Sequence, residues 1–86
     1  MQKQRIESLI GELVRLYREH NRQTIREVAI KAGCSSGTIT QIERGYINPS
    51  EDLTVRLGDA LNLTEQEASS LLFARNRRAA QYLRPA

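Results

Sequence analysis

The sequence has few of the residues that build disulfides, metal centres or membrane spans. Its 86 residues include one cysteine, one histidine and no tryptophan. A single cysteine excludes an intramolecular disulfide and a cysteine-based zinc site. The longest apolar run has four residues, Leu71 to Ala74, against the roughly 20 that a bilayer-spanning helix needs. The basic start is not followed by the apolar stretch of a secretory signal. We therefore expect a small cytoplasmic chain with no membrane partner.

Groups for catalysis are also scarce. The one histidine, His20, has no acid or nucleophile at a useful spacing, and no glycine-rich phosphate loop is present. Glu65 and Glu67 are better explained by the start of a helix, where negative charge is favourable. We predict that the chain is not an enzyme, and we expect no catalytic residue, metal, cofactor or small-molecule ligand.

Charge is unevenly distributed along the chain. Residues 1–44 hold eight Lys or Arg against five Glu, residues 45–74 hold one Arg against five acids, and residues 75–86 hold four Arg and no acid. Eleven of the thirteen cations are arginine, which pairs well with phosphate and guanine. Composition leaves two interpretations open, a nucleic-acid partner or an arginine-rich solvated surface.

Helical spacing of the apolar residues predicts five helices and no strands, which is a compact all-α fold. Short connections favour one domain over residues 1–86, with a core at about 5–75 and a basic end from 75 to 86. The first helix is predicted from about Gln4 to Glu19. Its expected apolar face is Ile6, Leu9, Ile10, Leu13, Leu16 and Tyr17.

Polar residues mark where the other helices begin and end. The predicted N-terminal caps of the second to fifth helices are Thr24, Ser35, Ser50 and Thr64. Two of them form capping boxes with a glutamate three residues on, Thr24 with Glu27 and Thr64 with Glu67. Gly33 and Gly45 supply the left-handed residues that end the second and third helices.

The second and third predicted helices are short and are joined by a tight turn at Gly33. Ile39 and Ile42 would fix the third helix to the second. Four short residues would then face outward: Ser36, Gly37, Thr40 and Gln41. Short hydroxyl and amide side chains let a helix approach base edges and bond to them. The pattern predicts a helix-turn-helix that places its second helix in the DNA major groove.

The segment TIREVAIKAGCSSGTITQIERGYINPS resembles the Xre family of bacterial and phage regulators, which includes the lambdoid repressors and Cro. The matching positions are Ala29, Gly33, Ser35, Thr38, Ile39, Thr40 (for serine), Ile42, Glu43, Arg44, Gly45, Pro49 and Ser50. The stretch RLGDALNLTEQE is similar to the family's fourth and fifth helices. The resemblance covers about residues 5–75.

This resemblance implies a five-helix lambda-repressor-like domain that binds operator DNA as a two-fold dimer. It also implies a buried structural ion pair, here Arg18 with Glu43. The expected DNA-binding residues are Arg22, Thr24, Arg26, Ser35, Ser36, Gly37, Thr38, Thr40, Gln41 and Arg44. Three departures weaken the match. Ile25 replaces a usual glutamine, Gly37 replaces a side chain that often reads bases, and residues 46–48 lack the usual basic charge.

The fifth helix suggests a second surface. Leu71, Leu72 and Phe73 are consecutive, so one helix face cannot bury all three, and we expect a dimer interface there. For the arginines from Arg75 to Arg84 three interpretations stay open: a solvated surface, added phosphate contact, or contact with acidic groups of another subunit. Cys34 is interpreted as a small buried hydrophobe, with a redox sensor as the alternative.

The leading prediction is a sequence-specific, dimeric transcriptional regulator of double-stranded operator DNA, with repression favoured over activation. Three contexts fit its size: a phage Cro-like or immunity repressor, an antitoxin that represses its own operon, and a controller of a restriction-modification operon. The alternative is a protein-interaction module, such as an antitoxin that acts mainly by binding a partner. A toxin or an antirepressor is a possible protein partner in either case.

Overall fold

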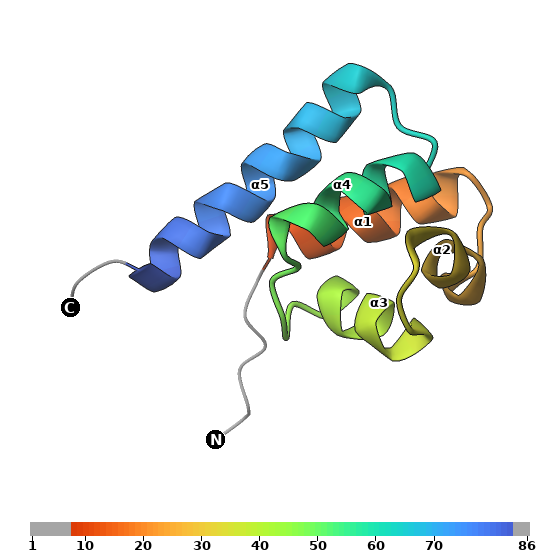
Figure 1. Cartoon of the computed structure of the whole chain (residues 1–86), viewed down its shortest axis with the longest axis horizontal. Coiled ribbons are helices and arrows are strands. Elements are labelled where there is room, and N and C mark those ends of the chain that lie inside the picture. Colours follow the sequence, from red (N-terminus) through yellow and green to blue (C-terminus); the bar gives the residue numbers. More distant parts are fainter. Residues whose placement is uncertain (1–7, 84–86) are drawn as a thin grey trace.

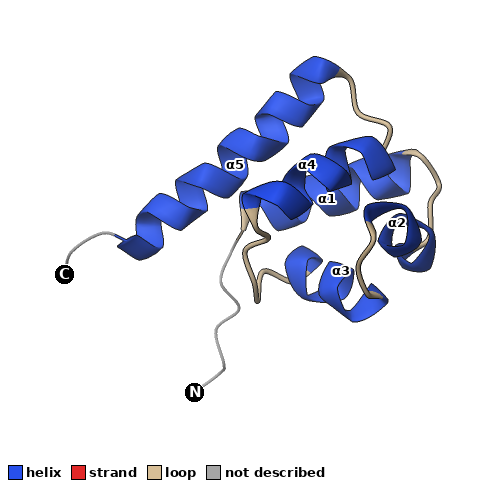
Figure 2. Cartoon of the chain, viewed as in Figure 1, coloured by secondary structure: helices blue, strands red, loops and turns tan. Residues whose placement is uncertain are grey.

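The computed structural model describes residues 8–83, with side chains described for residues 8–78. The elements are α1 (Leu9–His20), α2 (Ile25–Ala32), α3 (Ser36–Glu43), α4 (Glu51–Ala60) and α5 (Glu65–Leu83). The predicted all-α, five-helix architecture is confirmed, and the described part of the chain contains no strand (Figure 1, Figure 2). None of the described helices combines the length and the apolarity that a membrane crossing needs.

The helices pack in two groups around α1 and α4. The short helices α2 and α3 contact each other, α2 packs against α4, and α3 packs against α1. On the other side α5 packs against both α1 and α4 and extends past them toward the C-terminus (Figure 1). The interior between these groups is apolar. Its fully buried large side chains include Ile10, Val14, Val28, Ile39, Ile42, Leu57, Leu61 and Leu71.

The predicted helix caps are present. Each capping side-chain oxygen accepts a hydrogen bond from a backbone N–H three residues on, at Thr24, Ser35, Ser50 and Thr64. Glu27 and Glu67 accept in return from the backbone N–H groups of Thr24 and Thr64, so both capping boxes are complete. Each such cap stabilises a helix by about 0.5–2 kcal/mol. Short helices such as α2 and α3 depend on such local bonds as well as on packing.

The predicted start of the first helix is wrong, and its predicted apolar face is right only in part. The helix begins at Leu9 because Ser8 caps it through Gly11 N–H, at 3.1 Å. The residues predicted before Ser8, including Ile6, lie outside the described part of the chain. Ile10 is buried, and Leu13 and Tyr17 pack against the core, as predicted. Leu9 and Leu16 are exposed, and Gly11 and Val14 are buried in their place.

Gly11 decides which face of α1 turns inward. A β-carbon at this position would come closer than van der Waals contact to the backbone carbonyl oxygen of Ile42. Backbone of α1 therefore lies directly against the C-terminal end of α3. Only glycine permits that approach without moving one of the two helices. Rotating Leu9 or Leu16 inward would push a large side chain into this contact.

As predicted, one face of α5 does not bury all three apolar residues, but Leu71 is misplaced in the expected interface. Leu71 is completely buried in the core, together with Ala74, so it offers no surface to a second copy of the chain. Leu72 is half-buried and Phe73 is exposed. The expected interface is corrected to Leu72 and Phe73. A buried face that continues at helical spacing from Leu71 and Ala74 reaches Arg78, which is buried as well.

Candidate nucleic-acid interface

The turn between α2 and α3 is fixed by backbone hydrogen bonds. Gly33 has a φ of 74°, the left-handed conformation that glycine adopts without strain. Its N–H donates to the carbonyl of Ile30, and the N–H of Cys34 donates to Ala29. The Arg56 side chain of α4 donates from Nη1 to the Ala32 carbonyl at 2.7 Å. The end of α2 is thus satisfied, and the direction of α3 follows from it.

One side of α3 is buried and the opposite side is free. Ile39 and Ile42 have no exposed surface, whereas Ser36, Gly37 and Gln41 are exposed. Thr40 lies between these two sides and is half-buried. The structure therefore brings together the four residues that the sequence placed on one face. This outward face of α3, made of Ser36, Gly37, Thr40 and Gln41, carries short hydroxyl and amide groups and no charge.

Three other predicted contact residues already have structural partners. The Ser35 hydroxyl accepts from the Thr38 N–H at 3.1 Å and pairs with the Thr38 hydroxyl at 2.9 Å. The Thr24 hydroxyl accepts from the Glu27 N–H at 3.0 Å. These groups hold the starts of α3 and α2. The N-terminus of a helix also favours an anion such as a phosphate.

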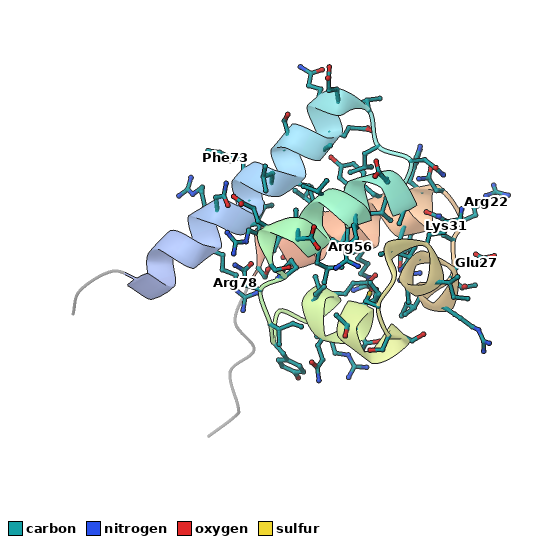
Figure 3. The ribbon with its side chains drawn as sticks, viewed as in Figure 1. Arg22, Glu27, Lys31, Arg56, Phe73 and Arg78 are labelled. Carbon is teal, nitrogen blue, oxygen red and sulfur yellow. The ribbon has the colours of Figure 1, made fainter. Side chains whose placement is uncertain are left out.

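Exposed arginines stand on the segments that flank α3. Arg26 lies on α2, Arg44 caps the C-terminus of α3, and both are exposed. Arg22 follows α1 with a φ of 56°, which is rare for a residue with a side chain. Its side chain extends away from the body of the protein (Figure 3). All three residues are exposed, so their guanidinium groups can reach a ligand outside the protein.

A shallow cleft of about 340 Å³ runs between α1, α2 and α3. Thr40 and Arg44 line it, and so does Ile25 on α2. The family's usual glutamine would therefore sit beside Thr40, and the isoleucine leaves that side of the cleft without an amide. Its remaining walls are charged residues of α1 and the end of α3: Arg15, Arg18, Glu19 and Glu43.

Arg18 and Glu43 form a bidentate ion pair between α1 and α3. Arg18 Nε donates to Glu43 Oε2 at 2.6 Å, and Arg18 Nη2 donates to Oε1 at 3.1 Å. The side chains are only 13% and 8% exposed. A third donor, Nη1, bonds to the Gln23 carbonyl at 3.0 Å. The hydrogen bond to Glu43 raises the pKa of the Arg18 guanidinium, against the opposing effect of its partial burial.

Cys34 lies in the turn and is half-buried rather than fully buried. Burial raises the pKa of its thiol, although the nearby Arg56 acts in the opposite direction. A raised pKa favours the protonated thiol, which is the unreactive form. Among the described residues no three His, Cys, Asp or Glu side chains gather as a metal site.

Several side chains that no sequence pattern singled out hold the ends of the helices. Asn21 and Gln23 donate to the carbonyls of Leu61 and Ala60 at 2.6 and 2.9 Å, which caps the C-terminus of α4. Arg75 and Arg78 of α5 donate to the loop between α3 and α4. For Arg78 a sequence signal existed, since it follows Leu71 and Ala74 on one helical face. Nothing in the sequence marks the partners of Asn21 and Gln23.

Comparison with known proteins agrees with this geometry. Residues 9–71 match the family described as the helix-turn-helix domain. The chain is also 32% identical over 56 residues to the HTH-type transcriptional regulator SlrR of Bacillus subtilis (strain 168). That alignment covers 64% of this chain and 37% of the relative, so the chain spans little more than a third of that protein's length. The family match, over residues 9–71, extends from α1 into α5 and includes the whole outward face of α3. The chain belongs to the helix-turn-helix domain family, and its motifs are those of the Xre-like type.

Proposed function

We propose that the protein is a sequence-specific regulator of transcription that binds double-stranded DNA in the cytoplasm. The observation that carries this proposal is the two-sided character of α3. Its buried side is fixed by Ile39, Ile42 and the Glu43 ion pair, while its outward face is polar, short and uncharged. A helix of this kind can lie deep in the major groove and keep one orientation there. The likeness to a named transcriptional regulator supports the same function.

Base contacts would come from the outward face of α3. Gln41 is exposed and can make a bidentate pair with adenine through its amide. Ser36 can bond to either base type, and the methyl group of Thr40 can touch a thymine methyl. Phosphate contacts would come from Arg22, Arg26 and Arg44, which are exposed. Because few side chains read bases, one half-site alone should bind with modest affinity.

A two-fold dimer would supply the remaining affinity. Leu72 and the exposed Phe73 of α5 are apolar groups on the surface, and Val55 of α4 is also exposed. A dimer formed there would present two copies of α3 to half-sites about 34–36 Å apart, one helical turn of DNA. Repression follows if such a site overlaps a promoter. Such a dimer would suit an antitoxin that represses its own operon, a phage repressor or a controller of a restriction-modification operon.

The test is selection of binding sites from a pool of random duplex DNA, followed by binding measurements on the selected duplex. We expect a palindromic site and an affinity that falls steeply with salt. Gln41→Ala should relax the preference at one symmetric base position and cost about 1–3 kcal/mol. Gln66→Ala on α5 is the control and should bind like wild type. Weak, sequence-blind binding that ignores Gln41→Ala would exclude base reading by α3.

The exposed apolar residues favour a second candidate, a module that binds a protein partner such as a toxin or an antirepressor. Phe73 is 61% exposed and Val55 is 57% exposed, so both apolar side chains are accessible to a partner. In that case Phe73→Ala would abolish capture of the partner, and Gln41→Ala would have no effect on it. A DNA regulator shows the opposite dependence on Gln41. The two substitutions together separate the two functions.

A further inference from the structure

The loop between α3 and α4 is held by side chains from the far end of the sequence. Arg78 donates from Nη2 to the Gly45 carbonyl at 2.8 Å and from Nη1 to the Ile47 carbonyl at 3.1 Å. Arg75 Nε donates to the Pro49 carbonyl at 3.0 Å. The side chain of Asn48 in turn donates to the Arg75 carbonyl at 3.2 Å. Arg78 points from α5 toward this loop in Figure 3.

Burial distinguishes Arg78 from an ordinary surface arginine. It is 5% exposed, and a charged group in such a place needs hydrogen-bond partners to offset its lost hydration. Carbonyl oxygens provide them here, at the end of α3, where the helix dipole also favours a cation. Its neighbour Arg77 is exposed and lies over the ring of Phe73, with 5.9 Å from its guanidinium carbon to the ring centroid.

The carbonyl groups that accept hydrogen bonds from Arg78 belong to residues that follow α3 in the chain. Gly45, with a φ of 81°, follows the helix, and Tyr46 stands between the two carbonyls that Arg78 holds. The Tyr46 side chain is exposed, and its N–H donates back to the Gln41 carbonyl at 2.9 Å. This hydrogen bond joins the loop to Gln41, a residue of the outward face. Since α3 and α5 are not among the helix pairs that pack extensively, the arginines supply a direct link between α5 and the end of α3.

We propose that Arg75 and Arg78 are positioning residues for DNA reading: they tie α5 to the loop after α3 and thereby fix the end of the outward face. This inference rests on the proposed function. This role differs from the three interpretations that the sequence left open for these arginines. In this role they hold the loop and neither contact phosphate nor serve as a solvated surface. If α5 forms the dimer, the link also fixes each α3 relative to the dimer axis.

The test compares Arg78→Lys and Arg78→Met with Arg77→Ala, the matched control on the same helix. Lysine keeps the charge but cannot bridge two carbonyls with a planar fork. The first measurement needs no DNA. Amide hydrogen exchange in the free, folded protein should rise about tenfold at Gly45 and Tyr46 in both Arg78 variants. The amides of Val28 and Leu57, far from the loop, should keep their protection, and Arg77→Ala should resemble wild type throughout.

The second measurement is binding to the selected duplex at several salt concentrations, well below the melting temperature. We expect both Arg78 variants to bind about tenfold more weakly with an unchanged salt dependence. A phosphate contact would give a different result: Arg78→Lys would bind nearly as well as wild type, and Arg78→Met would lower the salt slope by about 0.9. That outcome overturns the proposal. So does a uniform rise of exchange over the whole chain, which indicates a purely structural role.

The two measurements also separate this inference from the proposed function. If wild type fails to bind any duplex selectively, the proposed function fails, and the exchange result still decides whether the arginines hold the loop. If wild type binds selectively and exchange at Gly45 and Tyr46 does not change in the Arg78 variants, the positioning role fails alone.

Discussion

The two sides of α3 differ in almost every physical respect. Its outward face consists of short polar residues, of which Ser36, Gly37 and Gln41 are exposed. Its rear is Ile39 and Ile42 in the core, with the Glu43 carboxylate bound by Arg18. Even the backbone carbonyl of Ile42 lies against Gly11 of α1. A helix with such a rear can hold its outward face still, so little ordering entropy remains to be lost on binding.

This difference predicts which substitutions should lower stability and which should weaken binding. Changes at the rear should cost stability first and binding only as a consequence. Changes on the outward face should cost binding and leave stability nearly intact. The substitutions below test this division, beginning with the largest effect.

Glu43→Ala should cause the largest loss. It leaves the Arg18 guanidinium, 13% exposed, without its carboxylate, and breaking a buried pair in this way costs roughly 3–5 kcal/mol. Since small domains are stable by only about 5–15 kcal/mol, the variant should melt far lower or fail to fold. Thermal unfolding followed by circular dichroism measures the effect. An unchanged melting temperature would contradict the structural role of the pair.

The matched control is Arg15→Ala on the same helix. Arg15 and Glu19 also form an ion pair, at 3.3 Å, but their side chains are 63% and 55% exposed. A solvated pair of this kind contributes about 0–1 kcal/mol. The variant should therefore melt close to wild type. A large loss of stability in this variant would mean that burial does not explain the difference between the contributions of the two ion pairs.

Two glycine substitutions compare the rear and the front directly. Gly11→Ala places a β-carbon against the Ile42 carbonyl and should destabilise the protein by about 1–3 kcal/mol. Gly37→Ala meets only the Ser35 hydroxyl, at an ordinary 3.8 Å, and should stabilise it by about 0.4–1 kcal/mol. Chemical denaturation of both variants gives the two signs. Equal effects would show that α1 and α3 do not approach as closely as the structure has them.

Arg22→Gly tests the flank of the outward face with a smaller effect on stability. The left-handed backbone at Arg22 costs of order 1 kcal/mol, and glycine removes that strain while it adds freedom to the unfolded chain. Stability should thus stay within about 1 kcal/mol of wild type. Loss of a phosphate contact should weaken DNA binding and reduce the salt slope by about 1.

Asn62→Gly is the control for Arg22→Gly. Asn62 has nearly the same backbone, with a φ of 57°, at the end of α4. Its substitution should have a similarly small effect on stability and leave DNA binding unchanged. If both variants bind like wild type, Arg22 does not contact phosphate.

The sequence predicted the features that depend on local bonding. Five helices, both capping boxes and the αL glycines at Gly33 and Gly45 follow from rules that involve residues three or four apart. The burial of Ile39 and Ile42 follows from their helical spacing in the same way. The face of α1 followed only in part, because its apolar residues form a stripe that runs from Leu9 and Leu16 to Val14, and periodicity does not say which edge of that stripe is buried. The choice is made by Gly11, through a contact with α3 that the sequence does not encode locally.

The arginines show the same limit for the candidate site. Helical spacing places Arg78 on the buried face of α5 after Leu71 and Ala74, but only the tertiary structure shows the loop carbonyls to which it donates. The outward face of α3 was predictable because it needed only the helical repeat and two isoleucines. An arginine that is free to contact phosphate cannot be told from a structural one until its partners in the fold are known.

Cys34 should give the smallest effect, at the junction between α2 and the start of α3. Burial raises the pKa of its thiol in the folded chain above that in the unfolded chain. The protonated thiol thus contributes stability that is complete below the unfolded pKa and is lost as the pH rises through the folded pKa. Wild type should therefore lose stability relative to Cys34→Ala on the alkaline side, and its thiol should react with iodoacetamide more slowly in the folded than in the unfolded protein at pH values near 8. Equal alkylation rates would mean that the turn opens freely, and the start of α3 would then be less firmly held than its C-terminal end.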